Sequence, residues 1–105
     1  MARDRIFAEV LQELLDAKRS GSFFINVKES SEDLIRLYIK NGELDAITYG
    51  FAKGEDVMDI IEYYTLQNAT YFNGLAAPSD VLSMKLPMKK FIGAMRKANK
   101  TIRVA

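Results

Sequence analysis

The pair Asn41-Gly42 constrains the fold of this chain more than any other short segment. Asn-Gly is the preferred pair for a two-residue type I′ turn, because both central residues adopt positive φ. The flanking segments, residues 34–40 and 43–49, alternate apolar residues with polar ones, as half-buried β-strands do. The sequence therefore predicts a β-hairpin that turns at this pair.

The tight turn also predicts which residues of the hairpin face each other, because a two-residue loop sets the register. One face of the hairpin is then apolar and the other is partly polar. The predicted pairs are Lys40–Glu43, Ile39–Leu44, Tyr38–Asp45, Leu37–Ala46, Arg36–Ile47 and Ile35–Thr48.

The partly polar face of the hairpin is a candidate protein-docking surface, because tyrosine and arginine are enriched in binding hot spots. The alternative is that a helix of the same chain covers this face. The face holds Arg36, Tyr38, Lys40, Glu43, Asp45, Ile47 and Tyr49. The candidate interaction residues are Arg36, Tyr38, Asp45 and Tyr49.

Helical spacing of apolar residues predicts three helices elsewhere in the chain, and alternation predicts two further strands. Asp4 is the expected N-cap of the first helix, and Gly21 is its expected left-handed stop. The predicted helices cover residues 4–19, residues 54–65 and a C-terminal segment that starts at Pro87, with a short helical segment at Pro78-Ser79-Asp80. The predicted strands cover residues 22–28 and 68–72, and residues 98–105 are expected to fray.

These elements predict an α+β fold. Three consecutive strands with short turns form an antiparallel meander, a short fourth strand joins it, and an N-terminal, a middle and a C-terminal helix pack on it. A length of 105 residues predicts one domain over residues 1–105. No apolar run approaches the roughly 20 residues of a membrane span. The N-terminal segment lacks the apolar core of a signal peptide, so a cytoplasmic location is expected. Homodimerisation is an open possibility, because strand edges need cover.

The composition excludes several kinds of chemistry, because the chain has no cysteine and no histidine. Disulfides, thiolate nucleophiles, Cys/His zinc sites and imidazole catalysis are therefore excluded. Glu55, Asp59 and Glu62 fall on one side of the predicted middle helix, where paired carboxylates could bind Mg²⁺ or act as acid and base. The same spacing is that of a solvated helix face. We expect a protein that is not an enzyme and has no metal or cofactor.

The charge of the chain is strongly uneven along its length. Residues 1–80 contain 8 Lys and Arg and 14 Asp and Glu, whereas residues 81–105 contain 7 Lys and Arg and no acid. An acid-free segment of this kind suggests phosphate contacts with nucleic acid or binding to an anionic membrane. Packing beside the acidic body or a solvated face are the alternatives. The candidate basic surface consists of Lys85, Lys89, Lys90, Arg96, Lys97 and Lys100, with an apolar stripe of Met88, Phe91, Ile92 and Met95 on the same predicted helix.

Several of these segments together resemble the PATAN-like family of small bacterial domains attached to signalling modules. The resemblance covers roughly residues 6–97, from a Leu-rich first helix and the Gly-Ser-Phe-Phe-Ile strand onward. The hairpin matches at Asn41, Gly42, Leu44 and Ala46, and the start of the middle helix matches at Gly54, Glu55 and Val57. Asn68, Thr70 and Phe72 stand where the family has Gly-x-Phe-x-Phe, and no acids follow the last helix.

The resemblance implies a non-catalytic, protein-binding role in bacterial signalling or motility, without a cofactor. The absence of cysteine and histidine agrees with such a role. We therefore expect a protein-interaction module. The alternative is an electrostatic binder of nucleic acid or of an anionic membrane through residues 85–103.

Overall fold

The fold is an α+β arrangement of one sheet and three helices, as expected. A computed structural model describes residues 3–79, 81, 83 and 86–104. Within these residues, seven strands form a mostly antiparallel sheet in the order β1-β7-β6-β2-β3-β4-β5. The strands are β1 (Arg3–Ile6), β2 (Gly21–Val27), β3 (Ser30–Lys40), β4 (Glu43–Tyr49), β5 (Ala52–Lys53), β6 (Leu66–Asn73) and β7 (Thr101–Val104). The helices are α1 (Phe7–Asp16), α2 (Asp56–Tyr63) and α3 (Met88–Lys97).

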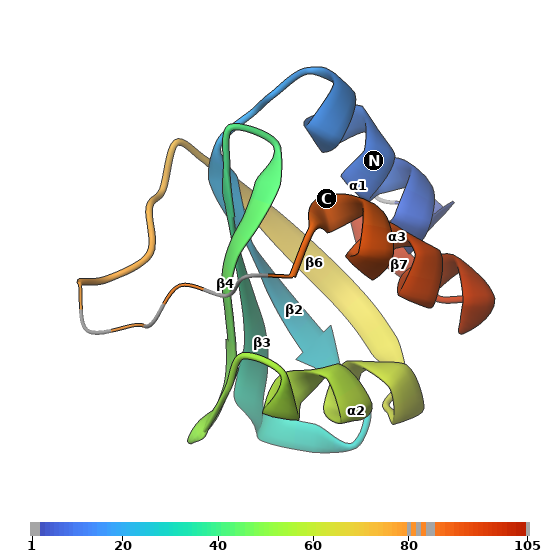
Figure 1. The fold of residues 1–105 in the computed structure, drawn as a ribbon. Helices are drawn as coiled ribbons and strands as arrows, with labels where there is room; N and C mark the ends of the chain where they lie inside the picture. Colours follow the sequence, from blue (N-terminus) through green and yellow to red (C-terminus); the bar gives the residue numbers. More distant parts are fainter. Residues whose placement is uncertain (1–2, 80, 82, 84–85, 105) are drawn as a thin grey trace.

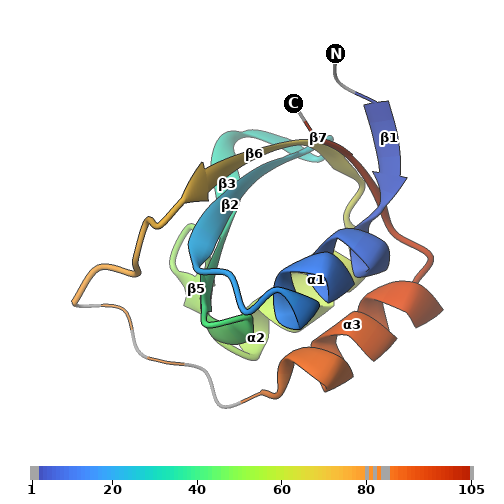
Figure 2. The same ribbon diagram turned by 90° about the horizontal axis from the view of Figure 1, so that it is seen from above.

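The sheet curves around α1 and α2, and α3 packs beside α1 (Figure 2). We call the face of the sheet toward α1 and α3 the inner face and the opposite face the outer face. Phe7 links the layers, because its ring meets Phe23 of β2 and Phe91 of α3 edge-on at 6.4 Å and 6.3 Å. All three rings are almost completely buried. The core therefore lies between the inner face of the sheet and the helices.

The predicted meander is confirmed, since β2 pairs with β3 and β3 with β4, both antiparallel. The turn is confirmed too, with Asn41 and Gly42 at φ values of 52° and 81°. The fourth strand, β6, is longer than predicted: it has eight residues, and six of them pair with residues of β2. Its pairing places β2 and β6 at the centre of the sheet.

The predicted register of the hairpin is correct only near the turn. The first two pairs, Lys40–Glu43 and Ile39–Leu44, are as predicted. Asp45 is then an extra, unpaired residue in β4. Tyr38 therefore pairs with Ala46, and every residue of β3 farther from the turn pairs one position further along β4 than predicted. Such a β-bulge re-aims the side chains that follow it. It turns Ile47 onto the inner face, where only 1% of its surface is exposed.

The prediction that the C-terminal residues fray is wrong. Thr101–Val104 form β7, which runs parallel to β6 and antiparallel to β1. Burial of Ile102 explains this order, because the side chain is only 1% exposed and belongs to the core. The sequence did not predict β7, because a strand of four residues with one buried side chain is too short to show the alternation of apolar and polar residues.

The first helix also begins and ends differently from the prediction. Residues 3–6 form β1, so Asp4 is a strand residue and not the N-cap, and α1 begins at Phe7. The left-handed residue after α1 is Lys18, with a φ of 52°, while Gly21 already belongs to β2. In place of the predicted helical segment at residues 78–80, the structure has a turn at Ser79, where the backbone N–H of Val81 donates to the carbonyl of Pro78 at 3.1 Å, and Asp80 lies outside the described residues.

One carboxylate links the turn after β2 to the start of β6. Glu29 accepts hydrogen bonds from the backbone N–H of Thr65 at 2.8 Å and from its hydroxyl at 3.1 Å. These bonds favour the charged form, with the backbone bond as the largest cause, so the pKa of Glu29 is lowered.

The lowered pKa predicts how this link responds to acid. Because the folded state has the lower pKa, the carboxylate stabilises the fold above the ordinary pKa of glutamate, and this stabilisation is lost as the pH falls through the lowered pKa. In an NMR titration we expect the amide resonance of Thr65 to shift with a midpoint below the ordinary pKa of glutamate. The shift should vanish in Glu29→Gln. A midpoint at or above the ordinary pKa of glutamate would contradict this.

Candidate functional site

The outer face of the sheet carries an aromatic cluster on its central strands. Phe24 of β2 lies opposite Arg36 of β3, and Ser22 of β2 lies opposite both Tyr38 of β3 and Phe72 of β6. The Phe24 ring is 5.0 Å from the Phe72 ring and 6.4 Å from the Tyr38 ring. The guanidinium carbon of Arg36 lies 5.7 Å from the centre of the Phe24 ring. We call Phe24, Arg36, Tyr38 and Phe72 the aromatic patch.

The aromatic patch is open to solvent at its rim and buried at its centre. Phe72 is 42% exposed and Arg36 is exposed, whereas Phe24 is half-buried and Tyr38 is only 5% exposed. The helices described in the structure lie on the other face of the sheet (Figures 1 and 2). A cation over an aromatic face is favourable by about 0.5–1 kcal/mol at exposed sites, so Arg36 and Phe24 hold each other in place.

A cavity of about 300 Å³ adjoins the hairpin and the loop after β6. The loop is attached to the sheet by the hydroxyl of Ser22, which donates to the carbonyl of Leu75 at 2.6 Å, and by the hydroxyl of Ser83, which donates to the carboxylate of Asp45 at 3.3 Å. Two opposite charges, Lys40 and Asp45, lie among otherwise small or apolar groups. The cavity is lined by Ser20, Ile39, Lys40, Asp45, Gly74, Leu75, Ala76 and Ala77.

Three of the four interaction residues predicted on the hairpin lie in the aromatic patch or line the adjoining cavity. Arg36 and Tyr38 belong to the aromatic patch, and Asp45 lines the adjoining cavity. The predicted place of Tyr49 on the same face is wrong, because the bulge at Asp45 turns it to the inner face. There its ring packs edge-on against Tyr64 at 5.8 Å.

Sequence reasoning missed the two phenylalanines of the aromatic patch. Phe24 interrupts the alternation of the strand that became β2, which was the one available signal. An apolar residue on the polar side of a strand indicates either cover by another element or a contact surface. Phe72 gave no such signal. Its contact with Phe24 depends on the pairing of β6 with β2, and the sequence does not show which strands are neighbours in the sheet.

The candidate basic surface is only partly formed. Lys89, Lys90, Arg96 and Lys97 are exposed on α3, and Lys85 lies outside the described residues. Lys100 does not belong to the exposed surface, because its ammonium group donates to the carbonyl of Tyr64 at 2.6 Å. Burial lowers the pKa of Lys100, and the charges of Glu29 and Glu62 oppose this.

The apolar stripe of α3 is part of the core. Met88, Phe91, Ile92 and Met95 are each at most 3% exposed. The question left open by the sequence is thereby settled, since α3 is packed on the body and presents only its charged side. No helix within the described ranges has the length and apolar character needed to cross a membrane.

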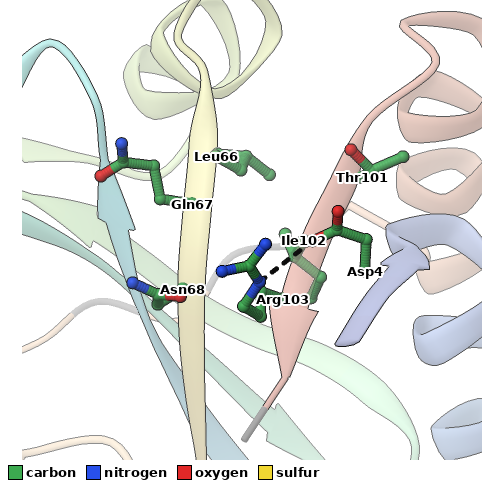
Figure 3. Close-up of a pocket in the computed structure, with 7 residues that line it drawn as sticks. All are labelled: Asp4, Leu66, Gln67, Asn68, Thr101, Ile102 and Arg103. Atoms are coloured by element: carbon green, nitrogen blue, oxygen red, sulfur yellow. Dashed lines mark hydrogen bonds and ion pairs between the residues drawn. The ribbon is translucent and has the colours of Figure 1, made fainter. Parts of the chain in front are cut away.

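A second cavity, of about 330 Å³, lies where β6 and β7 diverge (Figure 3). The two strands pair only at Asn68–Arg103 and Ala69–Val104, so a cleft opens beside them. Beside this cleft, Arg103 of β7 donates to the carboxylate of Asp4, its cross-strand partner on β1, at 3.3 Å. The cleft is lined by Asp4, Leu66, Gln67, Asn68, Thr101, Ile102 and Arg103.

The acidic residues of α2 lie on its solvent side. Glu55, Asp59 and Glu62 are all exposed, on the side opposite the buried Val57 and Ile61. Residues 3–79, 81, 83 and 86–104 contain no group of three or more Asp and Glu side chains arranged to hold a metal ion. A comparison of the chain with protein-family models, with curated protein sequences and with solved structures finds no match.

Proposed function

We propose that this chain is a non-catalytic protein-interaction module that binds its partner through the aromatic patch. One observation carries the proposal: aromatic rings and an arginine gather on a face of the sheet that the described helices leave uncovered. Aromatic residues and arginine dominate the energetics of protein interfaces. The adjoining cavity has room for one side chain of a partner.

The resemblance to the PATAN-like family supports the same role and suggests bacterial signalling or motility as its setting. The absence of histidine and cysteine also favours binding over chemistry, because it removes the commonest general base and the strongest side-chain nucleophile. A cytoplasmic protein of this kind would act by joining other proteins.

Removal of the exposed part of the patch tests this function. We expect Arg36→Ala combined with Phe72→Ser to weaken partner binding by about 2 kcal/mol, roughly 30-fold in Kd. The partner is first captured from a lysate of the native host with the unaltered chain and is then titrated by calorimetry against both forms. Circular dichroism verifies that the variant is folded.

Phe51→Ser is the matched control, because Phe51 is 103% exposed at the turn between β4 and β5 and lies outside the patch. It should bind the partner like the unaltered chain. A partner that binds the patch variant with unchanged affinity contradicts the proposed surface. A chain that binds only DNA or lipid contradicts the protein-binding role itself.

The alternative function, an electrostatic binder of nucleic acid or membrane, has the charges of α3 in its favour. Burial of the apolar stripe weighs against it for membranes, because an interfacial helix binds by inserting its apolar face. Binding to nucleic acid would fall steeply with salt.

A further inference from the structure

Gly93 lies in the middle of the exposed side of α3, where it has no role in the packing of this molecule. A Cβ added at Gly93 would have nothing within 4 Å. Glycine in a helix interior costs about 1 kcal/mol relative to alanine, so the helix gives up stability at this position. The absence of a side chain lets another backbone approach closely.

Cations surround this glycine on the same side of α3. Lys89 and Lys90 precede it by about one turn, and Arg96 and Lys97 follow by about one turn, so all four share its side by helical spacing. The four side chains are exposed. The described residues form two ion pairs, Arg5–Glu13 and Arg103–Asp4. Neither involves α2 or α3.

The exposed side of α2 has the complementary charge. It carries three carboxylates, with a fourth at its N-cap, and its last residue, Tyr63, is 79% exposed. The helices are of similar length, ten residues in α3 and eight in α2, and they lie on different sides of the molecule (Figure 1). The acidic residues are Glu55, Asp56, Asp59 and Glu62.

We propose that α3 of one molecule docks on α2 of a second copy of this chain, with Gly93 at the point of closest approach. Charge complementarity argues for this occupant, since the chain itself supplies an acidic helix face that matches the basic one in size. Tyr63 adds an aromatic face for Arg96. The contact joins two different surfaces, so each molecule can bind one neighbour through α3 and another through α2.

The first test is the mass of the unaltered chain in solution. By light scattering or sedimentation we expect the mean mass to rise with protein concentration at about 20 mM salt and to return to the monomer mass at about 0.5 M, because salt shortens the range of the attraction. A monomer at every concentration and salt level would overturn the proposal.

The second test removes the charges of each helix separately. The α3 variant is Lys89→Gln/Lys90→Gln/Lys97→Gln, and the α2 variant is Asp56→Asn/Asp59→Asn/Glu62→Gln. Each alone should remain monomeric. An equimolar mixture should form dimers and nothing larger, because only one productive contact remains, between α3 of the α2 variant and α2 of the α3 variant.

A matched control for net charge is Lys18→Gln/Lys28→Gln/Lys53→Gln, since these lysines are exposed outside α2 and α3, in the turns after α1 and β2 and in β5. It should associate like the unaltered chain. Loss of association in this control would overturn the proposal in favour of a general charge effect. Unchanged association of the α3 variant, together with loss of its binding to a single-stranded oligonucleotide or to anionic phosphatidylserine vesicles, would assign α3 to those ligands instead.

Gly93→Gln separates docking from folding. A side chain at this position should strengthen the helix, yet it should block close approach and lower self-association at least tenfold. A variant that is more stable than the unaltered chain and still associates equally well would overturn the role of Gly93. Its gain in stability also excludes misfolding as the cause of any loss.

Discussion

Replacement of Phe91 by Ala is expected to lower the free energy of unfolding by about 3–5 kcal/mol. Phe91 is completely buried in α3, and its ring meets Phe7 of α1 edge-on at 6.3 Å. Its removal deletes apolar contacts and leaves a cavity where the two helices meet. Since small domains are stable by about 5–15 kcal/mol, this single change would remove a large part of the total.

Urea unfolding of the variant measures this loss, and Phe51→Ala is the control of the same residue type. Phe51 is 103% exposed, so its removal should change the free energy by less than about 0.5 kcal/mol. Equal effects of the two substitutions would contradict the packing described for α1 and α3.

A Gly→Ala substitution is expected to lower the free energy of unfolding at Gly21 and to raise it at Gly93. At Gly21 an added Cβ would lie 2.7 Å from the carbonyl oxygen of Phe72 and would also collide with the ring of Tyr71. Because a backbone atom is involved, the strands must shift, at a cost of about 1–3 kcal/mol. At Gly93 the space is open and the helix interior favours alanine by about 1 kcal/mol.

The midpoint of urea unfolding should therefore fall in Gly21→Ala and rise in Gly93→Ala. Tyr71 provides a second readout, because its hydroxyl donates to the carbonyl of Ser20 at 3.0 Å and would be displaced in the first variant. A shift of both midpoints in the same direction would contradict the difference in their surroundings.

The hairpin was predictable because its turn is encoded in two adjacent residues. Asn41-Gly42 adopts the positive φ values that its residue types favour, and the first two pairs follow from it. The bulge at Asp45 was not predictable, because its stabilising contacts come from elsewhere: burial of Leu44 and Ile47 on the inner face, and the hydrogen bond from Ser83. Register beyond a turn depends on the whole core.

The candidate surface was only partly predictable for the same reason. Arg36 and Tyr38 followed from alternation along one strand, whereas Phe24 and Phe72 required the strand order. The residues of the apolar stripe of α3 were predictable from their helical spacing. Their burial was not, because it depends on the packing of α3 against α1. Periodicity shows which residues share a side of an element, and tertiary contacts decide what that side meets.

The attachment of β1 has a consequence for the order of events during synthesis. In the described structure β1 joins the sheet only through β7, and the two are linked by Asp4 and Arg103, which are 99 positions apart in the sequence. While the chain emerges from a ribosome, the strands β2, β3, β4 and β6 can pair among themselves, since they follow one another closely. Residues 3–6 must wait unpaired until Thr101–Val104 has emerged, and a contact of such long range forms late. Residues 3–6 are therefore synthesised before the rest of the sheet but are among the last to pair with it.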